Sequence, residues 1–235
     1  LFRSIRPTKN PMKLLEEGWK NTEIARYMRE TYGVSNEKTA LAITIANREK
    51  ALLQDLDYEN GYSLYVGIPF CPSICLYCSF GSHPLERWTK RVDEYLDTLC
   101  KELTFIREQM GTRKLTTVYI GGGTPTTLEP EQLRRLLSHI QETFDFTWVK
   151  EYTVEAGRPD SITREKLQVM KEFPVTRISV NPQTMNQKTL DVIGRKHTVE
   201  DTVNIFHMAR ELEFDNINMD LIIGLPGEGK EEVAH

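Results

Sequence analysis

Three closely spaced cysteines offer a ligand set for an iron–sulfur cluster. Cys71, Cys75 and Cys78 form a CxxxCxxC pattern directly after a strand-like run over residues 63–68. A [4Fe–4S] cube has four iron corners, so a loop with three protein thiolates leaves one iron able to bind a small molecule. The pattern therefore predicts a cluster with one open coordination position.

A structural zinc site is the alternative. Cys3His is an ordinary tetrahedral ligand set for zinc, and His83 follows Cys78 by five residues. Zinc sites usually pair CxxC units, however, and this loop does not repeat such a unit. The fourth cysteine, Cys100, falls in a helical apolar pattern with Leu96 and Leu103, so we expect it to pack as a small apolar side chain.

The elements that must position these cysteines alternate between strands and helices. Short, β-branched, apolar runs predict strands at 63–68, 117–120, 151–154, 176–180 and 217–223, with amphipathic stretches between them. Such alternation predicts a parallel sheet with right-handed crossovers. Because the polar motifs all follow strands, we predict an α/β fold, a partial (βα)6-type TIM-like barrel truncated after about five strands. An open doubly wound sheet is the alternative.

Residues 1–60 differ in pattern from this core, which we place at 61–235. Helical patterns run from residue 11 to 57 with no strand signal, so we expect an N-terminal helical adaptor packed on the main domain. A faint helix-turn-helix pattern raises the alternative of DNA binding. Ten Lys and Arg against nine Asp and Glu would make a poor phosphate-binding surface, and we therefore favour the adaptor.

The composition limits the cellular compartment and the partners that we expect for the protein. The 235 residues carry a net charge of −4, which gives no basic footprint for nucleic acid. The sequence shows no run of eighteen apolar residues and no signal peptide, and its four cysteines do not form a secreted disulfide framework. We expect a cytoplasmic protein with neither nucleic acid nor membrane as a partner. From the missing initiator Met we also expect a piece of a longer chain.

Glycines and a threonine follow the second predicted strand. Within the run 121–126, Gly122 and Gly123 allow backbone groups to come close to a ligand, and Thr124 adds a hydroxyl. A simple chain reversal is the alternative, since many glycine-rich turns do nothing more. The run lacks the Lys-Ser/Thr pair of a P-loop and the GxGxxG order of dinucleotide folds, so we do not expect phosphate as its ligand.

Charged and amide side chains follow the later strands. Glu155 ends the third predicted strand, where a carboxylate can pair with an ammonium or a ribose hydroxyl. Gln183 and Arg195 follow the fourth strand, and the turn at Gly194 makes a solvent-facing charge the alternative for Arg195. Asp220 falls inside an apolar strand, where a carboxylate is costly unless it faces a polar cavity or a ligand.

Together these motifs resemble the oxygen-independent coproporphyrinogen III oxidases, a branch of the radical S-adenosylmethionine (SAM) superfamily, and within it the HemZ type. The resemblance covers about residues 12–235. It rests on the order and spacing of the motifs Tyr65 to Cys71, the cysteine triplet, Gly121 to Thr126, Val154-Glu155, Asn181 to Gln183, Gly194-Arg195 and Met219 to Gly227. It implies an iron–sulfur oxidoreductase of porphyrin and haem biosynthesis.

The resemblance assigns roles residue by residue. It implies that the [4Fe–4S] cluster is held by Cys71, Cys75 and Cys78. It implies that the SAM bound to this cluster is contacted by Tyr65, Gly122 and Glu155. The family also holds a second SAM, whose contacts would fall on Tyr77, Gly123, Thr124, Gln183, Arg195 and Asp220.

The resemblance also implies a reaction and its partners. A 5′-deoxyadenosyl radical made from SAM would take a hydrogen from a propionate of coproporphyrinogen III, loss of CO2 would leave a vinyl group, and two such rounds would give protoporphyrinogen IX. The implied partners are this tetrapyrrole and a low-potential electron donor such as flavodoxin or ferredoxin. Haem-carrying and haem-degrading proteins share the core and are the alternative. The chain departs from the family at Gly67, often His, and at Phe80, often a fourth Cys.

Overall fold

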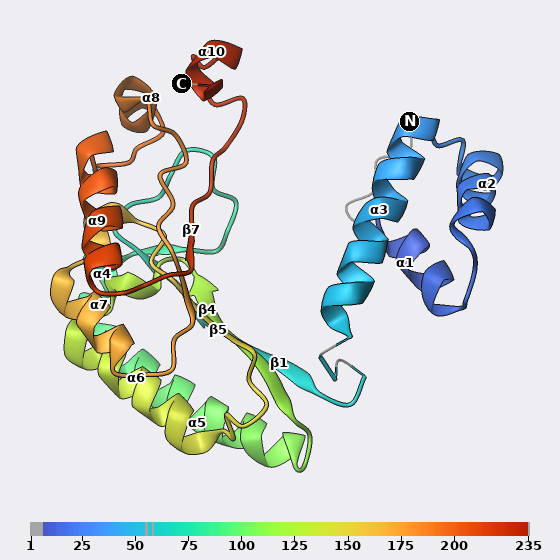
Figure 1. The fold of residues 1–235 in the computed structure, drawn as a ribbon. Coiled ribbons are helices and arrows are strands. Elements are labelled where there is room, and N and C mark those ends of the chain that lie inside the picture. The colour runs from blue at the N-terminus through green and yellow to red at the C-terminus, as the bar shows by residue number, and fades with distance from the viewer. Residues whose placement is uncertain (1–6, 55, 58, 235) are drawn as a thin grey trace. The chain divides into compact units, whose positions relative to one another are not determined.

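The chain folds into two compact units, residues 1–59 and 60–235, and each is described by itself (Figure 1). The computed structural model describes residues 7–54, 56–57 and 59–234. Position 55, which belongs to the predicted helical range 11–57, lies outside these residues. In the described part of the chain, no helix combines the length and the apolar character needed to cross a membrane.

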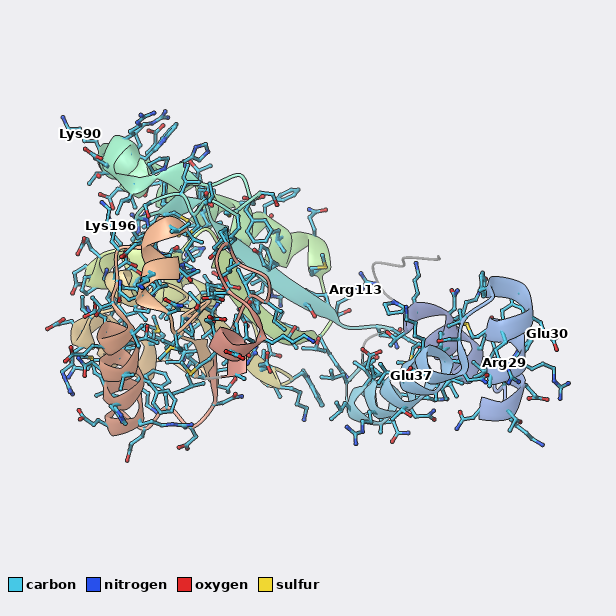
Figure 2. All side chains as sticks on the ribbon, turned by 90° about the horizontal axis from the view of Figure 1, so that it is seen from above. Arg29, Glu30, Glu37, Lys90, Arg113 and Lys196 are labelled. Carbon is cyan, nitrogen blue, oxygen red and sulfur yellow. The ribbon has the colours of Figure 1, made fainter. Side chains whose placement is uncertain are left out.

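The described part of the first unit is helical. Its helices are α1 (Lys9–Glu16), α2 (Asn21–Tyr32) and α3 (Asn36–Leu53). Gly33 ends α2 with a left-handed φ of 61°, and the Ser35 side chain caps α3 by accepting from the backbone N–H of Lys38. The apolar faces of the helices pack together through Leu14, Leu15, Ile24, Met28, Ile43 and Ala46. Charged side chains such as Arg29 and Glu37 stay exposed (Figure 2).

The second unit contains a five-stranded sheet whose strands lie side by side in chain order. They are β1 (Tyr62–Ile68), β4 (Leu115–Gly122), β5 (Glu151–Glu155), β6 (Arg177–Ser179) and β7 (Ile217–Asn218). Every neighbouring pair is parallel. A doubly wound sheet would reverse its order at a switch point, and the described strands show no reversal. The predicted partial barrel is therefore confirmed and the doubly wound alternative is wrong.

Helices lie along one side of the strands and cover the apolar face of the sheet (Figure 1). The helices that contribute buried residues to the core on this face are α5 (Val92–Met110), α6 (Pro130–Thr143), α7 (Arg164–Lys171) and α9 (Val199–Glu211). The shorter helices are α4 (Leu85–Trp88), α8 (Gln187–Val192) and α10 (Lys230–Ala234), and α8 and α10 take no part in this core. In α6, Leu133, Leu137 and Ile140 recur at the spacing of one helical face and are fully buried. This face and the strands form one continuous core, which fixes the sheet that carries the site.

The last strand is shorter than predicted. The sequence indicates a strand over 217–223, but β7 ends at Asn218, and beyond it a single bridge joins Leu221 to Gln183. Asp220 and Ile223 are exposed. Asp220 therefore lies beyond β7 and not inside the strand where the sequence analysis placed it.

Two glycines let the backbone of β4 lie directly against the backbone that follows β1. A Cβ on Gly123 would lie 2.7 Å from the Phe70 carbonyl oxygen and 2.9 Å from that of Ile68. The Gly123 N–H donates a hydrogen bond to the same Ile68 oxygen at 2.7 Å. A Cβ on Gly122 would meet the Ile68 nitrogen at 2.9 Å, and its φ of 104° also favours glycine. The missing side chains thus make room for the protein's own backbone, which the sequence analysis did not foresee.

Gly123→Ala should destabilise this unit, because the backbone oxygens beside it cannot move away without disturbing the pairing of β1 with β4. We expect the free energy of unfolding to fall by about 1–3 kcal/mol, the usual cost of overpacking. The matched variant Gly81→Ala, whose Cβ would meet nothing within 4 Å, should stay within about 0.5 kcal/mol of the native chain. Urea unfolding followed by circular dichroism measures both, and equal effects of the two substitutions would contradict this account.

Candidate functional site

The cysteine loop is closed at its base by a small two-stranded sheet. β2 (Phe70–Cys71) pairs in parallel with β3 (His83–Pro84), so the residues between them form one loop. Cys71 and Cys75 are buried, Cys78 is partly buried, and all are free thiols. The three cysteines line a single cavity, into which the loop brings them from positions up to seven residues apart.

The structure brings nearly all predicted site residues to this cavity, which has a volume of about 170 Å³ and lies at the carboxyl ends of the strands. Its lining includes Cys71, Cys75, Tyr77, Cys78, Gly122, Gly123, Thr124, Glu155, Gln183, Arg195 and Asp220. The Cys71 Sγ lies 3.5 Å from the Thr124 Oγ1, so the cysteine loop and the glycine run meet here. The convergence supports a shared binding function, while the role of each residue stays a prediction.

Tyr65 is the predicted site residue that lies outside this lining. Its side chain is 63% exposed and stacks on Tyr119, with ring centroids 5.8 Å apart. The Tyr119 hydroxyl in turn donates a hydrogen bond to the Glu155 carboxylate. The sequence analysis missed Tyr119, although it stands two positions before Gly121 in the same strand and so shares its face of the sheet. Tyr65 is thereby linked to the cavity through Tyr119.

Glu155 is the carboxylate best placed to meet a cation in the cavity. Burial raises its pKa, and the nearby charge of Asp220 adds to the rise, whereas the hydrogen bond from Tyr119 and the charge of Arg177 oppose it. The ionised carboxylate is therefore disfavoured while it faces the cavity alone. An ammonium group or a hydroxyl donor from a ligand would remove this penalty.

Arg195 is 6% exposed, so the solvent-facing alternative for it is wrong, whereas its neighbour Lys196 is exposed (Figure 2). Its Nη1 donates to the Asn181 carbonyl oxygen at 2.7 Å and its Nη2 to the Tyr77 hydroxyl at 3.2 Å. Burial raises the pKa of Tyr77 to about 12, although Arg195 opposes the rise, so the hydroxyl keeps its proton. The buried Nε of Arg195 has no hydrogen-bond partner among the described residues.

Gln183 and Asp220 reach the cavity from the loops after β6 and β7. Gln183 has a φ of 66°, a left-handed conformation that residues other than glycine rarely adopt. Its N–H donates to the Asp220 carbonyl oxygen at 3.0 Å, and its own carbonyl oxygen accepts from the Ile222 N–H at 2.9 Å. Asp220 lines the cavity while staying exposed, so it reaches the predicted site without the cost of deep burial.

Polar residues behind the cysteine loop were not predicted. Arg158 is buried and paired with Asp160, and the neighbouring His197 is buried with no hydrogen-bond partner for either ring nitrogen among the described residues. Burial lowers the pKa of His197 to about 4, and the charge of Arg195 adds to this, so the ring is neutral at pH 7. The signal that could have found Arg158 is its position three residues after Glu155, beyond the end of the same strand.

The arrangement does not match a zinc site. Within the described residues, no three Cys, His, Asp or Glu side chains are close enough to surround one metal ion. His83, the fourth ligand of the zinc alternative, is exposed, packs on the Trp88 ring and does not line the cysteine cavity. Zinc needs four ligands that converge at about 2.0–2.3 Å from a single ion. Three thiolates that each hold a different iron of a cluster need no such convergence.

The residues present do fit a thiolate-bound iron–sulfur cluster. Free thiols are the donors that such clusters take from proteins. The Arg158 Nη1 lies 3.6 Å from the Cys75 Sγ, and the Thr124 hydroxyl lies beside the Cys71 Sγ. Cationic and hydroxyl donors next to sulfur suit ligands that carry negative charge.

Comparisons with known sequences show which proteins this chain is similar to. The profile of the Radical SAM superfamily matches residues 65–235. The oxygen-independent coproporphyrinogen-III oxidase-like protein HemZ of Bacillus subtilis is 41% identical over 239 residues, which is 100% of this chain and 48% of that protein. The haem chaperone HemW of the same organism is 40% identical over 174 residues, which is 74% of this chain and 45% of that protein.

A relative of solved structure extends the comparison. The oxygen-independent coproporphyrinogen III oxidase of Escherichia coli is 30% identical over 225 residues, which is 95% of this chain and 49% of that protein. The structure of coproporphyrinogen III oxidase (HemN) from Escherichia coli, described as a radical SAM enzyme, matches with a TM-score of 0.67 and 30% identity, over 79% of this chain and 43% of that one. The chain thus spans about half the length of the curated relatives it matches.

Glu155→Gln should stabilise the ligand-free protein at neutral and higher pH. A carboxyl whose pKa is raised by folding has no effect below its unfolded pKa of about 4, lowers stability as the pH rises from there to the folded pKa, and keeps the full cost above it. The variant should therefore unfold at a higher urea concentration than the native protein at pH 8, and the two should converge in acid. Glu142→Gln, at an exposed position of α6, should follow the native protein throughout. A Glu155→Gln protein that is less stable at pH 8 would refute the burial argument.

Proposed function

The chain belongs to the radical SAM superfamily, and from this premise we propose that the protein oxidatively decarboxylates propionates of coproporphyrinogen III to vinyl groups, giving protoporphyrinogen IX. Bound together, a [4Fe–4S] cluster and SAM supply a 5′-deoxyadenosyl radical for such chemistry. The observation that carries the proposal is the single cavity in which three free thiols meet the polar residues of the strand ends. Relatives that are named for this oxidase activity support the choice of substrate.

Different residues of the chain bind the cluster and SAM in this proposal. In this proposal Cys71, Cys75 and Cys78 hold the cluster, and the other site residues hold SAM. Glu155, which is disfavoured as a lone anion, accepts hydrogen bonds from the SAM at the cluster, with Tyr65 and Gly122 beside it. A second SAM is held by Tyr77, Gly123, Thr124, Gln183, Arg195 and Asp220.

Selectivity in this reaction depends on which C–H bond is held nearest to the radical centre, so rigid positioning matters more than acid–base chemistry. The cysteine loop is tied down accordingly. The Leu76 N–H donates to the Ile193 carbonyl oxygen at 3.0 Å, and the Ser73 hydroxyl donates to the Gly194 carbonyl oxygen at 3.0 Å. These bonds fix the loop to the turn that carries Arg195.

A haem carrier is the second candidate, supported by the 40% identity to the haem chaperone HemW. The extent of the matches favours the oxidase. The HemZ and Escherichia coli oxidase matches cover 100% and 95% of the chain, whereas the chaperone match covers 74%.

The proposed partners follow from the chemistry. The substrate is a tetrapyrrole, and a low-potential protein such as a flavodoxin or ferredoxin delivers the electron that cleaves SAM. Each substrate radical that loses CO2 to form a vinyl group passes one electron to an acceptor. We place the reaction in the cytoplasm, where such donors and reduced thiols are maintained.

Cysteine substitutions should separate the cluster ligands from Cys100. In the full-length protein, Cys71→Ala, Cys75→Ala and Cys78→Ala should each lower the iron and sulfide retained after anaerobic reconstitution, with SAM cleavage reduced by more than about tenfold. Cys100→Ala should keep the native iron content, because Cys100 lies on α5 and does not line the cavity. Colorimetric iron and sulfide assays decide the matter. Equal losses in all of these variants, or zinc in place of iron, would rule out the assignment.

Product analysis should distinguish the oxidase from the carrier. Full-length protein incubated without oxygen with reductant, SAM and coproporphyrinogen III should yield 5′-deoxyadenosine, CO2 and protoporphyrinogen IX, all measurable by mass spectrometry. A haem carrier would instead bind haem stoichiometrically and leave the porphyrinogen unchanged. A protein with an intact cluster that forms no deoxyadenosine would be incompatible with the proposed reaction.

A further inference from the structure

Arg158 is a buried cation whose guanidinium lies against the cysteine loop. Its side chain is 4% exposed. The Nη1 lies 3.6 Å from the Cys75 Sγ and donates to both the carbonyl oxygen and the Oγ of Ser73, each at 3.0 Å. In the described part of the chain, no other charged side chain hydrogen-bonds to a sulfur of this loop. One edge of the guanidinium is thus committed to the loop.

The other edge of the guanidinium is held by Asp160. The Nε donates to Oδ1 at 3.0 Å and the Nη2 to Oδ2 at 2.7 Å, a bidentate pair that fixes both the plane and the rotation of the group. Burial works against the charge of Arg158, but Asp160 and the cysteines offset this and its pKa is raised. The His197 Nδ1 lies 4.0 Å from Asp160 and belongs to a neutral ring, so the ion-pair partner of Asp160 is Arg158 and not His197.

We propose that Arg158 positions Cys75 and raises the reduction potential of the cluster that Cys75 holds, an inference that rests on the proposed function. Reduction adds negative charge to a cluster, and a cation with an N–H donor at a ligand sulfur stabilises that charge. The effect is large where water is excluded, because a buried charge is screened less than an exposed one. Asp160 acts in the opposite sense, since its negative charge disfavours the reduced state.

A purely structural role for Arg158 makes different predictions. Arg158 also binds Ser73, so its loss would loosen the loop even without any electrostatic effect. Ser73→Ala removes the hydroxyl that joins the loop to Arg158 and Gly194 but leaves the contact between the guanidinium and the Cys75 sulfur. If the loop were only loosened, the iron content would fall both in a variant without Arg158 and in Ser73→Ala. Loosening would not shift the reduction potential in opposite directions when Arg158 and when Asp160 are removed.

The test is a redox titration of the reconstituted full-length protein. The reduced cluster is followed by electron paramagnetic resonance, and iron and sulfide per chain are measured in parallel. Arg158→Gln should lower the midpoint potential and Asp160→Asn should raise it, each at native iron content. Ser73→Ala should keep the native potential. Arg164→Gln should also keep the native potential, because it removes an exposed arginine that pairs with Glu211 on the surface of the same unit.

The outcomes separate this inference from the proposed function. Native potentials in both Arg158→Gln and Asp160→Asn at native iron content would overturn the role of Arg158 and leave the proposed function intact. If Arg158→Gln holds no cluster, Arg158→Lys, which keeps the charge but not the bidentate geometry, should lower the midpoint potential relative to the native protein. Native potentials in Arg158→Lys and Asp160→Asn would then overturn the inference. A native protein that forms no [4Fe–4S] cluster would overturn the proposed function itself.

Discussion

The site depends on how closely the backbone of β4 approaches the backbone that leaves β1. Gly123 donates its N–H to the Ile68 oxygen at 2.7 Å, in a space where any side chain would collide with backbone. Because of this approach, the glycine run and the root of the cysteine loop are joined, and the Cys71 sulfur comes within 3.5 Å of the Thr124 hydroxyl. The cysteine spacing supplies ligands and the glycine run supplies a surface, but only their contact makes them one cavity.

Charge balance is built into this cavity before any ligand binds. Thiols, Glu155 and Asp220 bring potential negative charge to the lining, and the buried guanidinium groups of Arg158 and Arg195 oppose it. Burying a guanidinium is costly unless its donors are satisfied. Backbone oxygens help to meet this cost, from Ser73 for Arg158 and from Asn181 for Arg195. Both cations are therefore held in place by the protein and not by the ligand, which is the condition for electrostatic preorganisation.

The sequence could predict where the site lies, because the carboxyl ends of parallel strands share one edge and motifs that follow strands must meet there. It could not predict which of the polar side chains are buried. Arg195 follows a turn that allows either exposure or burial, and only packing against the cysteine loop encloses it. The apolar run after Ile217 lacks ladder partners over most of its length, which composition does not reveal. Arg158 was missed because a lone arginine in a loop carries no periodic signal, and its place three residues after the end of a strand was the clue that the sequence offered.

Alternate residues of the same strands face the core on one side of the sheet and the ligand site on the other. Ile120 and Val154 are fully buried toward the helices, while their neighbours Tyr119 and Glu155 hydrogen-bond on the opposite face. A register slip of one residue would exchange the two sets, so the parallel ladder that pairs Ile120 with Val154 is itself part of the site. Because the two faces are separate, residues on the ligand side can change without disturbing the core. Proteins named as oxidases and as chaperones can therefore share this scaffold, and their difference must be sought in the residues that face the ligand.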